Sequence, residues 1–308
     1  MSATTVLPAA ISTTAKKPSG KRAGVKSFYP SWFYIPAGAL YFVFFALPTF
    51  ASFYFALTRW DLFGAQFIGF DNFVTFFQEP QLYQGFINTF VYGFVTSGLK
   101  VVIGLALALL LTSPIIGRGY LRAVVFFPVL VSTIGVGLTF KALLDPFHGM
   151  VNGFLGLFGI AGPGWLTDPK LALLSVAGID VWKGVGIATL IFMAGIVAIP
   201  QEYFEAAKVD GASSWKIFRS ITLPLTRPAT GTVIILSLIG GLRSFDLIWA
   251  TTRGGPGFTS DVIASVIYKQ YQAGFFGLST AGNVILFIVV TAIMVPISRL
   301  LNRGEVEA

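Results

Sequence analysis

The 308-residue sequence contains no cysteine and a single histidine, His148. Without cysteine there is no disulfide framework, no thiolate nucleophile and no cysteine-based metal site. Because no second histidine exists, we interpret His148 as a solvated residue of a loop rather than as a metal ligand or a general base. We therefore expect no catalytic residue and no metal site. The redox compartment cannot be inferred from cysteine usage.

Charged residues are also scarce. They make up 11% of the chain, against 55% hydrophobic residues, and the mean hydropathy is +0.79. Soluble domains carry roughly 25% charged residues, so this chain lacks the polar surface that water requires on every side. Its 31 phenylalanines and six tryptophans suit a lipid-facing surface with aromatic belts. The composition indicates an integral membrane protein.

Nucleotide-binding motifs are missing as well. No G-x-x-x-x-G-K-[ST] sequence occurs, so a P-loop cannot form and any ATP hydrolysis must take place on another chain. The glycines of Gly184-Val-Gly186 lie within an apolar stretch, without the strand–turn–helix setting of a dinucleotide site. The chain itself is not expected to be an enzyme or to bind a cofactor.

Six apolar stretches are long enough to cross a bilayer as helices, which takes about 20 residues. They fall at 32–57, 87–112, 121–144, 171–199, 229–251 and 281–301. A further apolar segment, 151–161, is short and glycine-rich, so we expect a loop or an interfacial piece there. The predicted fold class is an all-α membrane protein with six transmembrane helices.

The segment before the first span, residues 1–30, is rich in small and basic residues and contains no acidic residue. It lacks the short apolar core of a secretory signal. We expect a disordered basic cytoplasmic tail, with an organellar transit peptide as the alternative, followed by a transmembrane domain over 31–308.

Basic residues predict the orientation. Thirteen lysines and arginines lie in the N-terminal tail, the 113–120 turn with its flank, the 200–228 loop and the C-terminus, whereas the alternate loops hold four. The positive-inside rule then places both termini in the cytoplasm. This distribution also explains the net charge of +8 without nucleic acid, and leaves anionic lipid as a partner.

The loop at 200–228 has a helix–turn–helix pattern. Helix-forming residues fill 201–209, Gly211 follows as a turn residue, and Ser213 is placed to cap a second helix that Leu223-Pro224 should stop. Two interpretations are open: an amphipathic connector lying in the membrane interface, or a docking element for a cytoplasmic partner.

Several short motifs occur in order along the chain. The loop contains Glu205-Ala206-Ala207, Asp210-Gly211-Ala212 and Ile221-Thr222-Leu223-Pro224. The others are Phe67-Ile-Gly-Phe-Asp-Asn-Phe73, Asn88-Thr89, Arg122 with Phe127-Pro128, Phe245-Asp-Leu-Ile248 and Gly254-Gly255-Pro256. The loop motifs resemble the "EAA" loop, and the whole set resembles one family, the membrane subunits of binding-protein-dependent ABC importers in their carbohydrate form.

The resemblance implies a type I importer permease in the plasma (inner) membrane of a prokaryote. It implies three kinds of partner: a second, homologous permease subunit, cytoplasmic ATP-binding subunits that carry the ATP and Mg, and an extracytoplasmic solute-binding protein. The residues implied to couple to the ATPase subunit are Glu205, Ala206, Ala207, Asp210, Gly211, Leu223 and Pro224. Residues 58–85 are too few for the large folded insertion of some maltose-type members, so the binding protein should meet smaller loops.

Charged residues within the predicted spans are costly and indicate function by default. Asp180/Lys183 and Arg243/Asp246 are opposite charges at i, i+3, which places each pair on one helix face and leaves Lys100 without a same-helix partner. Self-neutralisation within the bundle and lining of a substrate pathway are both open. The candidate pathway residues are Asn88, Lys100, Asp180, Trp182, Lys183, Arg243, Asp246 and Asn283.

Because these two pairs sum to zero, we expect an uncharged cargo, most simply a sugar. The same machinery for a polyol, a glycerol phosphate or an amino acid is the alternative. An ion-driven secondary transporter would often show internal repeats with broken helices, which the sequence lacks. An intramembrane enzyme would need a nucleophile or metal cluster within the spans, and none is evident.

Overall fold

The computed structural model describes residues 31–61 and 63–302. The chain divides into two compact units, Met1–Pro48 and Thr49–Ala308. Apart from turns and loops, the described part consists of helices and one two-stranded hairpin. The predicted disordered tail over 1–30 lies outside the described residues.

The first unit contains the beginning of one candidate span. A short 3₁₀ turn, Ser31–Tyr34, leads into α1 (Ile35–Tyr41), a π-helical turn (Phe42–Ala46) and the start of α2 (Leu47–Phe55). A helix long and apolar enough to cross a membrane covers Trp32–Phe55, as the sequence predicts.

Three further helices pass the same test in one piece: α4 (Pro80–Thr112), α8 (Ala172–Val197) and α15 (Phe276–Asn302). They confirm three of the predicted stretches. With 33 residues, α4 is about 50 Å long and exceeds a hydrocarbon core of about 30 Å. The described residues thus hold four candidate spans, or up to six if each of two bent helix pairs counts as one.

The predicted span 121–144 consists of two helices, which together are long and apolar enough to cross a membrane. The structure has α5 (Arg118–Leu130) and α6 (Thr133–Leu143) with an angle of 102° between them. Val131 and Ser132 take extended backbone conformations, with ψ of 140° and 136°, which ends the first helix. Alone, the 13 residues of α5 reach only about 20 Å.

The predicted span 229–251 is also interrupted. Helix α12 (Arg227–Leu242) ends before a short break, and α13 (Asp246–Thr251) follows it. A loop then leads to α14 (Ile263–Gln272). Sixteen residues give α12 a length of about 24 Å.

The core of the second unit is built on α4, which packs against both α8 and α12. Small residues allow this close approach: a Cβ on Gly241 of α12 would stand 2.8 Å from the Cα of Gly93 on α4. Membrane helices commonly associate through such small residues. Hydroxyls add to the contact, since Ser97 Oγ of α4 and Ser237 Oγ of α12 lie 2.7 Å apart.

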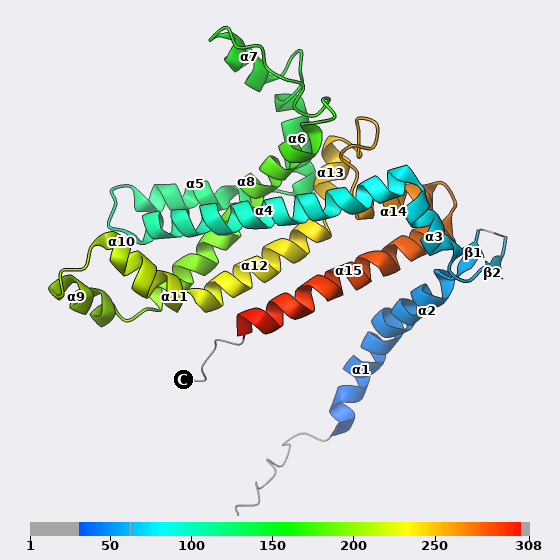
Figure 1. Ribbon diagram of the computed structural model, residues 1–308, viewed down its shortest axis with the longest axis horizontal. Helices are drawn as coiled ribbons and strands as arrows, with labels where there is room; N and C mark the ends of the chain where they lie inside the picture. Colours follow the sequence, from blue (N-terminus) through cyan, green and yellow to red (C-terminus); the bar gives the residue numbers. More distant parts are fainter. Residues whose placement is uncertain (1–30, 62, 303–308) are drawn as a thin grey trace, which may run out of the picture. The chain divides into compact units, whose positions relative to one another are not determined.

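The two ends of this bundle carry different structures (Figure 1). One end holds the α4–α5 turn and the helices α9–α11. The opposite end holds the antiparallel hairpin of β1 (Thr58–Trp60) and β2 (Ala65–Phe67), then α3 (Asp71–Gln78), and α14. A short helix, α7 (Met150–Gly156), occupies part of the apolar segment 151–161, in agreement with its prediction as a non-spanning piece.

Candidate functional site

The predicted helix–turn–helix loop forms as expected in its first half. Helix α9 covers Gln201–Val209, starts after Pro200, and carries Glu202 in its first turn and Lys208 in its last. Both charges complement the helix dipole, which favours acids at the N-terminus and bases at the C-terminus. The sequence pattern was therefore sufficient to locate this helix.

Gly211 forms the turn that ends α9. Its φ is +72°, in the left-handed region. The Gly211 N–H donates to Lys208 O at 3.0 Å and the Ala212 N–H to Ala207 O at 2.9 Å, which together make a Schellman motif. A Cβ at this position would meet no atom within 4 Å, so backbone conformation rather than space within the chain requires glycine here.

The second helix starts as predicted but ends later. Ser213 Oγ accepts a hydrogen bond from the Lys216 N–H and caps α10 (Ser214–Ile217). The helix then continues through a π-helical turn (Phe218–Thr222) and α11 (Leu223–Leu225), bending by 66° only where α12 begins. The prediction that Leu223-Pro224 stops the helix is wrong. The wider π turn leaves room for the proline, whose ring would clash with a carbonyl one α-turn earlier.

The surface of this loop combines exposed charge with exposed apolar groups. Glu205, Ala206 and Asp210 are exposed, and Val209 and Trp215 are 88% and 67% exposed. None of the loop's charged side chains takes part in an ion pair among the described residues. Neighbouring apolar and charged groups without internal partners form a surface suited to docking a protein or to lying at a membrane interface.

The intramembrane charges pair differently from the prediction. Asp180 of α8 forms an ion pair with Lys100 of α4, Nζ to Oδ2 at 2.8 Å, and not with Lys183 on its own helix. Sequence spacing detects only same-helix neighbours, so this inter-helix pair could not be found from it. Lys183 has no ion-pair partner among the described residues, and it replaces Lys100 as the unpaired central cation.

Arg243 and Asp246 do not share a helix face. Arg243 follows the last residue of α12, Asp246 begins α13, and Phe245 between them has a non-helical φ of −133°. Both side chains are exposed, and they form no ion pair with each other. The i, i+3 argument failed because the helix breaks between the two residues.

Three uncharged pathway candidates have different environments. Asn88 is buried and its amide is engaged on both atoms: Nδ2 donates to Thr259 O and Asp261 O, and Oδ1 accepts from Gln84. Trp182 is 42% exposed and packs edge-on against Phe140. Asn283 is exposed. Trp182 and Asn283 are accessible to a solute, although Asn283 Nδ2 donates to Ser279 O at 3.4 Å, whereas Asn88 positions the loop before α14.

Asp261 is a buried charge that sequence reasoning missed. Its side chain is fully buried, forms an ion pair with Lys269 and accepts a hydrogen bond from Ser265 Oγ at 2.7 Å. Ser265 and Lys269 lie on α14, whereas Asp261 precedes Val262, which has an extended backbone, so helical spacing in the sequence does not reveal these contacts. Thr89 Oγ1 accepts from the Ile263 N–H at 2.8 Å, so α4 holds the same segment from the other side.

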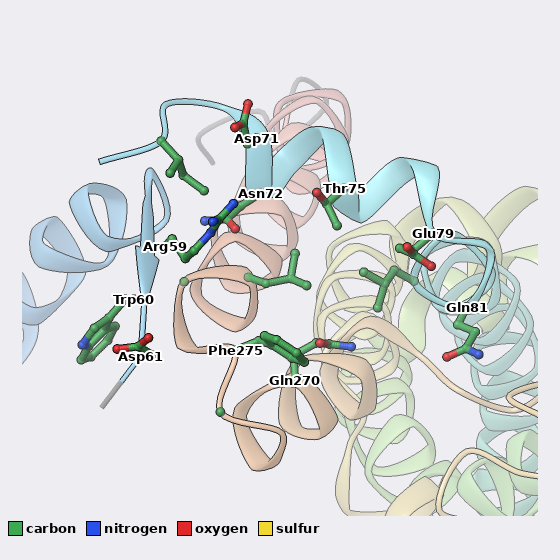
Figure 2. Close-up of a pocket in the computed structure, with 15 residues that line it drawn as sticks. Arg59, Trp60, Asp61, Asp71, Asn72, Thr75, Glu79, Gln81, Gln270 and Phe275 are labelled. Carbon is green, nitrogen blue, oxygen red and sulfur yellow. The ribbon is translucent and has the colours of Figure 1, made fainter. Parts of the chain in front are cut away.

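At the end of the bundle opposite α9 lies an open cavity of about 500 Å³, which we call the outer cavity (Figure 2). Its walls come from the hairpin, α3, the start of α4 and the α14–α15 turn. The polar and aromatic lining comprises Arg59, Trp60, Asp61, Asp71, Asn72, Thr75, Glu79, Gln81, Gln270 and Phe275. The lining contains three carboxylates and one arginine, so the outer cavity has a net negative lining.

The single histidine behaves as expected of a solvated loop residue. The side chain of His148 is 93% exposed, and its Nδ1 lies 3.6 Å from Asp145 Oδ1. Hydrogen bonds from the His148 and Phe147 backbone N–H groups lower the pKa of Asp145. The described residues contain no group of three or more His, Cys, Asp or Glu side chains that could hold a metal ion.

Comparison with known proteins agrees with this geometry. Residues 22–305 match the family described as "Binding-protein-dependent transport system inner membrane component". The trehalose/maltose transport system permease protein MalF of Thermococcus litoralis is 34% identical over 258 residues, which cover 83% of this chain and 88% of that protein. The multiple sugar-binding transport system permease protein MsmF of Streptococcus mutans is 29% identical, covering 90% and 97%.

A solved structure shows the same architecture. The crystal structure of a bacterial ABC transporter involved in the import of the acidic polysaccharide alginate aligns with a TM-score of 0.78 at 25% identity, over 89% of this chain and 95% of that one. The candidate spans, the helix–turn–helix loop and the family match agree with one another. The chain is a multi-pass membrane protein with the ABC type I permease fold, and it belongs to the family of binding-protein-dependent transport system inner membrane components.

Proposed function

We propose that this chain forms half of the translocation pathway of an ATP-driven importer for a carbohydrate, and that the loop formed by α9–α11 docks on a cytoplasmic ATP-binding subunit. The observation that carries the proposal is the Schellman turn at Gly211, which fixes two short helices with exposed Glu205, Val209 and Trp215 at one end of the bundle. A preformed surface loses little conformational entropy on binding, which suits an element that must transmit force.

The second permease subunit would complete the pathway. Trp182, Lys183, Arg243, Asp246 and Asn283 are the residues on this chain that we propose line it. An aromatic face with neutral amides is typical of sugar recognition, and the relatives' names, trehalose/maltose and multiple sugar-binding, support a carbohydrate.

An anionic sugar is the second candidate, and one observation favours it. Lys183 has no ion-pair partner among the described residues, so a cation within α8 is left for an acidic solute. The structurally similar alginate importer carries an acidic polysaccharide. For this candidate Lys183 would be the anion contact, since the charge of Lys100 is already neutralised by Asp180.

The outer cavity is the surface that we propose receives the extracytoplasmic solute-binding protein. It lies at the end of the bundle opposite α9, and its lining of Asp61, Asp71 and Glu79 suits a basic or amide-bearing side chain of a partner. Without a large inserted domain after the first span, a hollow between short segments is the available docking geometry.

The test is uptake by cells that carry the whole transport system. Radiolabelled maltose and trehalose are offered with competitors: neutral disaccharides, a sugar acid, a sugar phosphate and an amino acid. The neutral proposal expects competition by neutral sugars alone, with no change on Lys183→Met beyond abundance. Competition by the acidic sugars that Lys183→Met abolishes would establish the anionic alternative. Competition by the amino acid alone would contradict both.

A further inference from the structure

One ion pair joins the two helices that lie between the loop α9–α11 and the opposite end of the bundle. Helix α8 ends at Val197, and three residues separate it from α9, which begins at Gln201. Helix α4 holds the segment before α14 through Asn88 and Thr89. Lys100 and Asp180 connect α4 to α8 between these two points.

The geometry of this contact is specific. The Lys100 and Asp180 side chains are 9% and 21% exposed, with Nζ and Oδ2 at 2.8 Å. Gly184 lies one turn after Asp180 on α8, and a Cβ there would stand 2.7 Å from Lys100 Cε and 3.0 Å from its Nζ. The Lys100 side chain therefore passes over Gly184, which has no side chain, to reach Asp180. We call Lys100, Asp180 and Gly184 the clasp.

A charged pair at this depth is costly to keep. Breaking a buried pair leaves an uncompensated charge, whereas replacing both ions by neutral groups of similar shape often preserves or improves stability. Charges inside membrane spans are rare for this reason and by default indicate function. Close packing of small residues already holds α4 to the bundle, so the pair is not needed for contact alone.

We propose that the clasp positions α4 relative to α8, so that a displacement of α9 passes through α8 and α4 to the segment 259–263. From Asp180 to Val197, α8 is a continuous rod of roughly 25 Å. From Lys100 back to Asn88, α4 continues it for roughly 18 Å. Rigid helices joined by a discrete ion pair are a physical route by which distant sites are coupled. This proposal rests on the proposed function, because it needs an ATPase that moves α9.

The competing explanation is that the two charges only neutralise each other. The double variant Lys100→Met/Asp180→Asn separates the two, because it removes both ions together and leaves no uncompensated charge. Gly184→Ala is the second variant; it keeps both ions but obliges the end of the Lys100 side chain to shift from its path past α8. The matched control is Gly178→Ala, also within α8, where a Cβ would meet nothing within 4 Å.

The complete transporter is purified with each variant and reconstituted in vesicles. Yield of the assembled complex, ATP hydrolysis without the binding protein, ATP hydrolysis with the liganded binding protein, and solute transported per ATP are measured. We expect both clasp variants to assemble and to keep the unstimulated hydrolysis. Transport per ATP should fall about tenfold in the double variant, within the 5- to 150-fold range usual for coupling between sites. It should fall by less in Gly184→Ala, where only the flexible end of Lys100 has to move. Gly178→Ala should match the unmodified protein.

Two outcomes would contradict the proposed role of the clasp. Normal transport per ATP in the double variant would show that the ions only neutralise each other. Failure of both clasp variants to assemble would make them folding residues. If the unmodified complex itself shows no hydrolysis stimulated by the binding protein, the proposed function fails instead, and the two failures are thereby distinguished.

Discussion

Replacement of Gly211 tests the turn on which the docking surface depends. At φ +72° the backbone conformation of an L-residue is about 1–2 kcal/mol less favourable than that of glycine, and β-branched residues tolerate it least. Because a Cβ at this site meets no atom within 4 Å, the backbone penalty is the main intramolecular effect expected of Gly211→Val. A penalty of this size reduces the population of the native turn roughly 5- to 30-fold.

The assay compares uptake with ATP hydrolysis at equal abundance in the membrane. Gly211→Val is expected to insert and accumulate normally but to lower transport per ATP by about the factor given by the turn population. Gly211→Asn is the permissive variant, because asparagine visits the left-handed region at low cost, and it should retain most of the coupling.

Gly117 offers a matched control. Its φ is +77°, a Cβ there would also meet nothing within 4 Å, and it lies in the α4–α5 turn outside the docking loop. Gly117→Val therefore carries a similar backbone penalty and should leave transport per ATP unchanged. Normal coupling in Gly211→Val at normal abundance, or equal losses in the two valine variants, would refute the reasoning.

Three further predictions follow from the loops and their charges. Single cysteines can be introduced without background labelling, because the chain has no native cysteine. A cysteine at Gln66 should react with a membrane-impermeant thiol reagent in intact cells, and one at Ser214 only after the cells are opened. The reverse pattern would show that the predicted topology is inverted. Lys269→Met should destabilise the chain by about 3–5 kcal/mol, seen as a lower thermal midpoint in detergent, because Asp261 is left charged and buried, whereas Lys269→Met/Asp261→Asn should recover most of it. Asp71→Lys in the outer cavity should raise the binding-protein concentration needed for half-maximal stimulation of ATP hydrolysis without changing unstimulated hydrolysis; an unchanged concentration would exclude the outer cavity as the docking surface.

The sequence was sufficient to predict those features of the fold that depend on residues close together in the chain. Hydropathy located the apolar stretches, and helix formers with a glycine turn and a serine cap located α9, Gly211 and Ser213. The sequence-based predictions of helix boundaries failed where a helix is interrupted within a long apolar stretch. Nothing in the hydropathy of 121–144 separates α5 from α6, and Pro224 is accommodated by a π turn that a proline rule does not anticipate.

Contacts between residues of different helices could not be predicted from local sequence patterns either. The pairing of Lys100 with Asp180, 80 residues apart, depends on how α4 packs on α8 and on the space that Gly184 leaves. The hydrogen bonds of Asn88 to Thr259 and Asp261 span more than 170 residues. The structure therefore separates candidates that contact other segments, such as Asn88 and Lys100, from candidates that do not pair, such as Lys183.

Site-specific photo-crosslinking at Val209 tests the central claim most directly. Val209 is 88% exposed at the C-terminal end of α9, beside the Gly211 turn, and Val102, 67% exposed within α4, is the control. With a photoreactive amino acid at Val209 in cells that express the complete system, the account predicts one covalent adduct with the ATP-binding subunit, and none from Val102. An assembled, transporting complex in which Val209 forms adducts with lipid alone would contradict the docking of this loop on the ATPase.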